Sequence, residues 1–352
     1  MKNKLIIDVD SGIDDSYALA IASLNENTEI IAITVVHGNT SVENGAINSK
    51  LVLDKIYPKH KEQPPIYIGA VKPLTKSENV FYFHNKDGLA GTHENIYKNE
   101  VDQIKETFLK EKITADSEHA AKKIVELVNQ YPNEITIIAL APLTNLALAL
   151  KVSPDQAKFT NNIRKVVIMG GNEPDGFFDA HTHDTSSNYP EFNFRTDPDA
   201  AKMVLDCYKC PLTITTFDCC LRSFEVKTDE LIQDFEKYIH ESKRCRFLER
   251  IGIIHRLACK NPLTFYSCDL VAVLGFLHSD ECKAVFKKLN NYTIKVENSN
   301  MDGLLVERTE SKESINENIE ICTTMNSFYA YNLFKTYLEK MKLLDEKEVN
   351  SV

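Results

Sequence analysis

Four aspartates lie within eight residues near the start of the chain, at Asp8, Asp10, Asp14 and Asp15. Carboxylates held this close together repel one another, which raises their pKa values. A bound divalent cation removes that conflict, and a ligand set made only of oxygen atoms suits Ca²⁺ or Mg²⁺ rather than zinc. Capping of a helix N-terminus would explain Asp14 or Asp15, but not Asp8 and Asp10 as well. The cluster therefore predicts a metal site, although Asp8, which directly ends a strand, is also a candidate for a structural role.

The hydrophobic pattern of the chain indicates which elements position this cluster. Apolar, β-branched runs alternate with helical patterns, which predicts an open, mostly parallel sheet with helices on both faces, in one α/β domain over residues 1–352. The predicted strands cover residues 5–7, 30–36, 66–68, 135–140, 166–169 and 212–215, and the predicted helices lie around residues 17–24, 42–56, 144–150 and 197–207. Ligands bind such sheets beyond the carboxyl ends of the strands. The polar residues and motifs expected there are at Asp8, Asp10, Asn39, Leu140 and Gly170.

Three further segments complete the expected organisation. Residues 79–99 are polar and contain glycine, and we predict a long loop that could act as a lid over the site. The alternative is a surface excursion without function. Residues 292–308 predict a β-hairpin or edge element, and residues 326–344 predict a closing C-terminal helix.

Composition limits the classes of partner. The formal net charge is -10 and no long Lys/Arg block is present, so a nucleic-acid partner is not expected. A small neutral substrate, or a site that holds a cation, agrees better with this charge. Only three apolar residues follow the basic start, and no apolar run reaches ~18 residues, so neither a signal peptide nor a membrane partner is expected. We therefore expect a cytoplasmic protein.

The chain has nine cysteines, all after residue 206. With no secretory signal, we expect reduced thiols. Cys207 and Cys210 have the spacing of half a zinc knuckle, but no matching second half is evident. Packed, reduced cysteines are therefore the favoured interpretation.

The segment from Asp8 to Ala18, with the sequence DVDSGIDDSYA, resembles the N-terminal signature of the inosine-uridine-preferring nucleoside hydrolase family. Further stretches resemble that family in the same order along the chain. They are VHGN at 36–39, HNKDGL at 84–89, LAPLTNLA at 140–147, MGGN at 169–172, PEFN at 190–193, DPDAA at 197–201 and SCDL at 267–270. Each stretch alone is modest, but the ordered set, which spans roughly residues 4 to 275, is specific.

This resemblance implies a Rossmann-like α/β domain that holds one Ca²⁺ and hydrolyses the N-glycosidic bond of ribonucleosides, in nucleoside salvage. Carried over, Asp10, Asp15 and Asp269 would bind the ion through carboxylates, and Leu140 would bind it through its main-chain carbonyl. Asp10 would also be the general base for the attacking water. The residues that would grip the ribose hydroxyls are Asp14, Asn39, Glu191 and Asn193. Members of the family are commonly dimers or tetramers, so a homodimer or homotetramer is expected, with a nucleoside as its small-molecule partner.

The residue before Asp269 departs from the commonest family patterns. Broadly specific members have His at this point and purine-specific members have Trp, whereas this chain has Cys268. This resembles a third subgroup that is associated with 6-oxopurine nucleosides, so we expect a preference for inosine and guanosine. The alternative is that Cys268 only packs.

Two other departures concern the rest of the substrate. The family has an Asn shortly before Glu191 for the ribose 5′-hydroxyl, and the nearest candidate here is Asn188, at an unusual spacing. The same stretch contains a His181, His183 and Asp184 group, which could form a second metal site but is better interpreted as a polar loop. The chain also has no Trp, so Phe, Tyr or His would have to stack on the base. The candidates near the base or leaving group are His84, His255 and Arg256, each of which could equally be a core or surface residue.

Two other functions remain open on the sequence. Haloacid-dehalogenase-type phosphatases use a strand followed by Asp-x-Asp, with the first Asp as nucleophile, and Asp8 and Asp10 have that spacing. The residues that follow here do not resemble the usual continuation in those phosphatases. The second alternative is an inactive relative that binds nucleosides. Four acids of the site argue against it, namely Asp10, Asp14, Asp15 and Asp269.

Overall fold

The protein is described from a computed structural model. It describes residues 2–75, 84–112, 119–174, 190–223, 226–258, 264–265, 267–308 and 318–350, and in 226–228, 253–258 and 264–265 it describes the main chain only.

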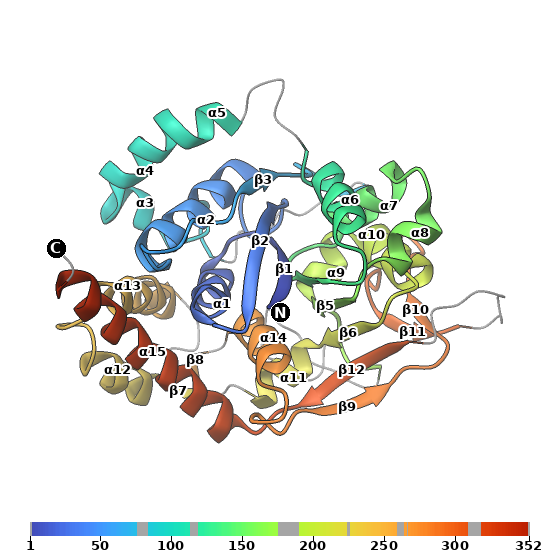
Figure 1. Cartoon of the computed structure of the whole chain (residues 1–352). Helices are drawn as coiled ribbons and strands as arrows, with labels where there is room; N and C mark the ends of the chain where they lie inside the picture. The colour runs from blue at the N-terminus through green and yellow to red at the C-terminus, as the bar shows by residue number, and fades with distance from the viewer. Residues whose placement is uncertain are drawn as a thin grey trace.

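An eight-stranded sheet forms the centre of the molecule (Figure 1). Its order is β3-β2-β1-β4-β5-β6-β12-β9, and every neighbouring pair is parallel except β12 with β9. The strands are β1 (Asn3–Val9), β2 (Thr28–Val35), β3 (Ile66–Ile68), β4 (Ile135–Ala139), β5 (Lys165–Met169), β6 (Leu212–Thr215), β9 (Val285–Lys288) and β12 (Ile319–Thr324). The chain runs outward from β1 to β3 and then returns to β4 on the other side of β1, so the order reverses between β1 and β4. Ligands bind open parallel sheets in the crevice at such a reversal.

The sheet has a hydrophobic cluster on each face, because its buried strands alternate their side chains between the two. Leu5, Ile7 and Val9 of β1 belong to one cluster, and Ile6 belongs to the other. The first cluster includes residues of α1 (Ile13–Leu24), α2 (Val42–Ile56), α4 (Lys98–Ile104), α11 (Phe217–Ser223), α12 (Thr228–Glu236), α13 (Lys243–Ala258), α14 (Cys268–Leu277) and α15 (Ser327–Asn350). The second includes residues of α6 (Ala120–Gln130), α7 (Thr144–Val152), α8 (Gln156–Asn161), α9 (Phe192–Thr196) and α10 (Pro198–Cys207). The predicted α/β architecture is thus confirmed.

The smaller elements lie around this core. They are α3 (Thr92–Asn95), a π-helical turn (Lys105–Leu109), α5 (Lys110–Lys112), the antiparallel pair β7 (Val226–Lys227) with β8 (Thr264–Phe265), and the antiparallel pair β10 (Tyr292–Ile294) with β11 (Leu305–Glu307). The last pair confirms the predicted hairpin. The prediction of one long loop over 79–99 is wrong for its described part, since α3 and the start of α4 lie within it.

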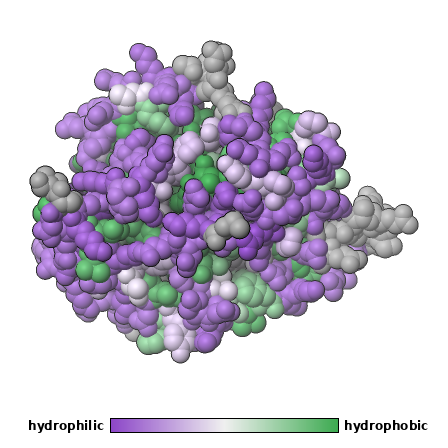
Figure 2. Space-filling model, in the orientation of Figure 1, coloured by the Kyte–Doolittle hydropathy of each residue, from purple (hydrophilic) through white to green (hydrophobic). Residues whose placement is uncertain are grey.

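The surface in the view of Figure 2 is mostly hydrophilic, with apolar residues in small groups. Among the helices of the described residues, none is both long and apolar enough to cross a membrane.

Candidate active site

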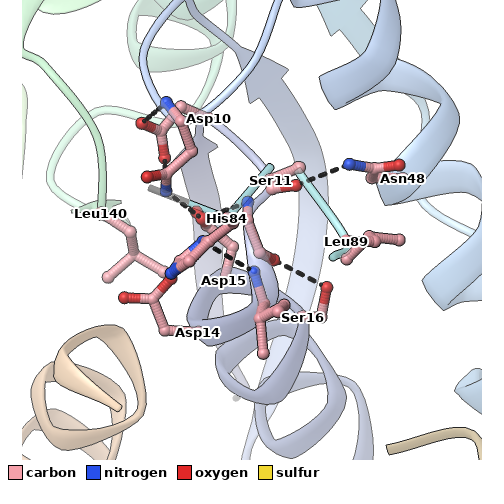
Figure 3. A network of polar contacts seen from close by, with 12 residues as sticks. Asp10, Ser11, Asp14, Asp15, Ser16, Asn48, His84, Leu89 and Leu140 are labelled. Atoms are coloured by element: carbon pink, nitrogen blue, oxygen red, sulfur yellow. Dashed lines mark hydrogen bonds and ion pairs between the residues drawn. The ribbon is translucent and has the colours of Figure 1, made fainter. Parts of the chain in front are cut away.

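The predicted site residues gather where the strand order reverses. Asp10 follows β1, Asn39 lies shortly after β2, and Leu140 follows β4 directly. Figure 3 shows Asp10, Asp14, Asp15 and His84 around the loop and first turn that connect β1 to α1, with Leu140 to one side. The carboxyl ends of three adjacent strands therefore supply this part of the site, as the sequence predicted.

The N-terminus of α1 fixes two of the aspartates. Asp14 and Asp15 occupy its first turn, where the helix dipole favours negative charge. The main-chain N–H of Gly12 donates to Asp15 Oδ2 at 2.7 Å. Ser11 has a positive φ of 39°, which turns the chain sharply between Asp10 and the helix. The helix cap thus orients the Asp15 carboxylate, and the turn places both aspartates at the start of the helix.

Asn39 holds Asp10 from the adjacent strand end. Its main-chain N–H donates to Asp10 Oδ2 at 2.6 Å, and its side-chain Nδ2 donates to Asp10 Oδ1 at 3.0 Å. The same Nδ2 is 3.5 Å from Asp15 Oδ2, so one amide connects two of the acids. His84 Nδ1 accepts from the main-chain N–H of Ile13 at 3.1 Å, and it lies 3.6 Å from Asp14 Oδ1.

Asp269 reaches this group from the other end of the chain. It lies in the first turn of α14, which packs against α1. Carboxylate oxygens of Asp14, Asp15 and Asp269 all come within 4.8 Å of one another. Within the described part of the chain, the buried oxygens Asp15 Oδ1 and Asp269 Oδ1 have no hydrogen-bond partner. Such oxygens are costly to bury unless a ligand completes them.

Asp10 is not part of the group of three acids whose oxygens all lie within 4.8 Å of one another. The resemblance grouped Asp10, Asp15 and Asp269 as ligands, whereas this group contains Asp14 in place of Asp10. The two hydrogen bonds from Asn39 orient the Asp10 carboxylate, and each of its oxygens keeps a further lone pair.

A second set of residues lies at the ends of β4 and β5. Glu191 precedes α9 and accepts from the main-chain N–H groups of Gly171, Asn193 and Phe194. Asn193 Nδ2 donates to the carbonyl oxygens of Leu140, at 3.0 Å, and Met169, at 3.1 Å. Asn193 therefore ties the Leu140 carbonyl to the neighbouring strand end.

Asn172 lies beside Glu191 and was not among the site residues predicted from the sequence. Its side-chain Oδ1 accepts from the main-chain N–H of Glu191 at 2.7 Å, which holds the main chain of Glu191 in place. The signal that could have identified it was its place at the end of the MGGN motif.

Asp8 is enclosed within the sheet. Its Oδ1 accepts from Thr34 Oγ1 at 2.5 Å and from Asn145 Nδ2 at 2.8 Å, and its side chain is fully buried. These bonds tie β1 to β2 and to the start of α7. Asp8 is therefore structural, and it is badly placed to attack a phosphate ester.

The other predicted site residues fall in three classes. Cys268 begins α14 and is half-buried, and its carbonyl is 3.6 Å from Cys220 Sγ. His255 and Arg256 lie on α13, whose side chains beyond Gly252 are not described. Asn188, with His181, His183 and Asp184, lies outside the described residues.

Burial dominates the electrostatics of the site. It raises the pKa of Asp10 to about 8 and that of Glu191 to about 7. It also raises the pKa values of Asp15 and Asp269 well above the ordinary range, and the neighbouring aspartates add to the effect. Burial lowers the pKa of His84 to about 4, so its imidazole is neutral at pH 7.

These shifts predict how stability varies with pH when no metal is bound. Raised pKa values mean that the folded protein holds protons that the unfolded chain has already lost above about pH 4. The free energy of unfolding, and with it Tm, should therefore fall as pH rises from about 5 to about 8. Differential scanning fluorimetry in EGTA measures this. Glu191→Gln should flatten the fall, and a Tm that rises over this range would contradict the prediction.

Gly38 allows the close approach of the Asp10 carboxylate. A Cβ at this position would overlap Asp10 Oδ2. If the chain has the hydrolase activity that the sequence resemblance implies, Gly38→Ala should displace Asp10 and lower kcat/KM for that activity by about 100-fold. Gly275→Ala in α14 is the matched control, because its Cβ would meet only the flexible Met325 side chain. Equal activity of the two variants would show that the position of Asp10 does not matter.

Comparisons with known proteins agree with this geometry. The family model described as inosine-uridine preferring nucleoside hydrolase matches residues 5–330. The chain is 34% identical over 205 residues to the probable uridine nucleosidase 1 of Oryza sativa subsp. japonica, covering 58% of this chain and 55% of that protein. It is 31% identical over 208 residues to the inosine-uridine preferring nucleoside hydrolase of Leishmania major, covering 58% of each. The matched segments thus span little more than half of these relatives.

A solved structure supports the fold. The one described as an inosine-guanosine nucleoside hydrolase superposes with a TM-score of 0.74 at 23% identity, covering 96% of this chain and 99% of that chain. The residues matched by the family model include all the motifs that carry the resemblance, from Asp8 to Leu270, and the match confirms that resemblance. The chain belongs to the inosine-uridine preferring nucleoside hydrolase family.

Proposed function

We propose that this protein hydrolyses the N-glycosidic bond of ribonucleosides with water, to free base and ribose, using a bound Ca²⁺ ion. One observation carries the proposal. Two buried carboxylate oxygens, Asp15 Oδ1 and Asp269 Oδ1, have no partner among the described residues and lie close together with Asp14 at the reversal of the strand order. A polar ligand belongs at that point.

The donor set suits calcium. Carboxylates of Asp10, Asp15 and Asp269 and the carbonyl of Leu140 are hard oxygen ligands, which Ca²⁺ accepts in flexible numbers. The Leu140 carbonyl accepts from Asn193 and keeps a second lone pair for an ion. When bound, the ion orients the attacking water and lowers its pKa.

The protein's own residues perform the rest of the reaction. Cleavage develops positive charge on the ribose, and the carboxylates of Asp14 and Glu191 stabilise it. Together with Asn39 and Asn193, these residues are placed to hold the ribose hydroxyls. Asp10, whose oxygens are fixed by Asn39, takes the proton of the attacking water as general base. Water then adds from the face opposite the base, with inversion at the anomeric carbon.

Within the nucleosides, we propose a preference for inosine and guanosine. The support is Cys268, which immediately precedes Asp269 and can neither stack on a base as Trp does nor donate a proton as His does. A purine base can be protonated at N7, so it leaves with less help from the protein. The relative described as a uridine nucleosidase makes uridine the main competitor.

A panel of inosine, guanosine, adenosine, uridine and cytidine tests both levels of the proposal. Free ribose should appear fastest from inosine and guanosine, and EGTA should suppress it. Cleavage of uridine alone would overturn the purine preference but not the hydrolase. Nucleoside binding without ribose release would instead support an inactive relative, and release of phosphate from phosphate esters would support a phosphatase.

Two further expectations accompany the function. We propose that the protein is a homodimer or homotetramer that acts in the cytoplasm in nucleoside salvage. Light scattering coupled to gel filtration measures the first of these directly.

A further inference from the structure

A pair of buried thiols lies outside the site described above. Cys219 is in α11 and Cys322 is in β12, and their sulfur atoms are 3.7 Å apart. Both side chains are almost fully buried, and Ser223 Oγ lies 3.4 Å from Cys219 Sγ. In Figure 1, α11 and α14 lie beside each other next to β12. The proposed hydrolysis makes no use of this pair.

A cavity lies beside one thiol of the pair. Cys322 belongs to the lining of a cavity of about 200 Å³, together with Val167, Ala272 and Phe276. The same lining includes Lys165 and Glu320, whose side chains are 31% and 33% exposed. A molecule as small as a hydroperoxide can therefore reach Cys322 in the cavity wall. The sulfur of Cys219 lies 3.7 Å from that of Cys322.

The chemistry of the pair suits oxidation. A disulfide has an S–S distance of about 2.05 Å, so the two sulfurs need to approach by less than about 2 Å. The hydrogen bond between the two thiols lowers the pKa of Cys219 and raises that of Cys322, so Cys219 is the thiol that more readily forms the thiolate that reacts with peroxides. We propose that Cys219 and Cys322 form a redox site, which a hydroperoxide converts to a disulfide.

The reaction balances in two steps. One thiol attacks the peroxide, the O–O bond breaks, and a sulfenic acid and one water (or alcohol) form. The second thiol then attacks the sulfenic sulfur, the S–O bond breaks, and the disulfide and a second water form. The two thiols lose two electrons and two protons to the peroxide. A dithiol reductant reverses the reaction.

Oxidation of this pair has a path to Asp269. Cys220 follows Cys219 in α11, and its sulfur contacts the carbonyl of Cys268, the residue before Asp269. A covalent bond between α11 and β12 shifts α11 against α14, whose first turn carries Asp269. The redox site of Cys219 and Cys322 does not depend on the proposed function, whereas the effect of its oxidation on Asp269 rests on that function.

Peptide mapping of the full chain tests the proposal. The folded protein is treated with a small excess of hydrogen peroxide, alkylated and digested without reduction. We expect a linked pair of peptides containing Cys219 and Cys322, which dithiothreitol separates. Cys322→Ser should lose the linked pair, whereas Cys207→Ser, at an exposed cysteine, should keep it. The peptide map of the wild-type protein alone shows whether Cys219 and Cys322 become linked. The proposal can therefore be tested even if the Cys322→Ser variant is unstable.

Three results would overturn the redox site. They are a pair that stays reduced while Cys207 is oxidised, recovery of both cysteines as sulfinic or sulfonic acids, and linkage of Cys322 to any other cysteine. If the disulfide forms, ribose release should fall severalfold and return with dithiothreitol. A disulfide with unchanged ribose release would retain the redox site and reject its path to Asp269.

Discussion

Asp10→Asn should lower kcat for the release of base from inosine by about 1,000-fold or more, because general base catalysis typically contributes 10²–10⁴-fold. The amide has nearly the same shape as the carboxylate but cannot take a proton from water. It also turns a donor toward Asn39, which now donates to both oxygens of Asp10. Steady-state kinetics at saturating calcium measure the effect, and circular dichroism checks the fold.

Asp8→Asn is the matched control for this substitution. Asp8 is two residues away and equally buried, and burial raises its pKa to about 7. Its partners are Thr34 and Asn145 rather than the acidic cluster. Asp8→Asn should keep kcat within about tenfold of wild type, because Asp8 only helps to hold β1 in place and takes no part in the reaction. An Asp10→Asn enzyme with more than a tenth of the wild-type kcat would remove Asp10 from the role of base.

Removal of calcium should abolish hydrolysis and also lower Tm. A ligand present at 100 times its Kd stabilises the folded state by about 2.7 kcal/mol, so added calcium should raise Tm by several degrees. The acids concerned repel one another when the ion is absent, which increases the effect. Tm in EGTA against calcium is measured by scanning calorimetry, and ribose release is measured in the same two buffers.

Asp269→Asn links the stabilisation to the predicted site. It should remove most of the calcium-dependent gain in Tm, because Asp269 Oδ1 is one of the two buried oxygens without a partner in the described chain. Asp102→Asn is the control, since Asp102 is 48% exposed on α4. If the two variants respond equally to calcium, the ion binds elsewhere.

The sheet could be predicted from the sequence, but its far edge could not. Continuous apolar strands such as residues 135–139 are recognisable because both faces are buried. Residues 319–324 of β12 and the exposed strand β9 include charged side chains and were missed. Tertiary pairing with β6 makes β12 a strand, and no local pattern contains that information.

The positions of the candidate site residues could be predicted from the sequence, but their contacts could not. Asp10, Asp15 and Asp269 lie at the strand and helix ends where the motifs placed them, because spacing within a motif determines this. The orientation of the Asp10 carboxylate depends on hydrogen bonds from Asn39, which is distant in sequence. The structural role of Asp8 depends on partners at Thr34 and Asn145, which are distant in sequence.

The cap on α1 has a consequence for the discrimination between cations. One oxygen of Asp15 accepts from Gly12 N–H, which restricts the position of its other oxygen before any ion binds. A preorganised ligand loses little rotational freedom on binding, and it cannot move inward to follow a smaller ion. Mg²⁺, which demands shorter bonds and strict octahedral geometry, would leave a gap at Asp15, whereas the larger Ca²⁺ tolerates its fixed place.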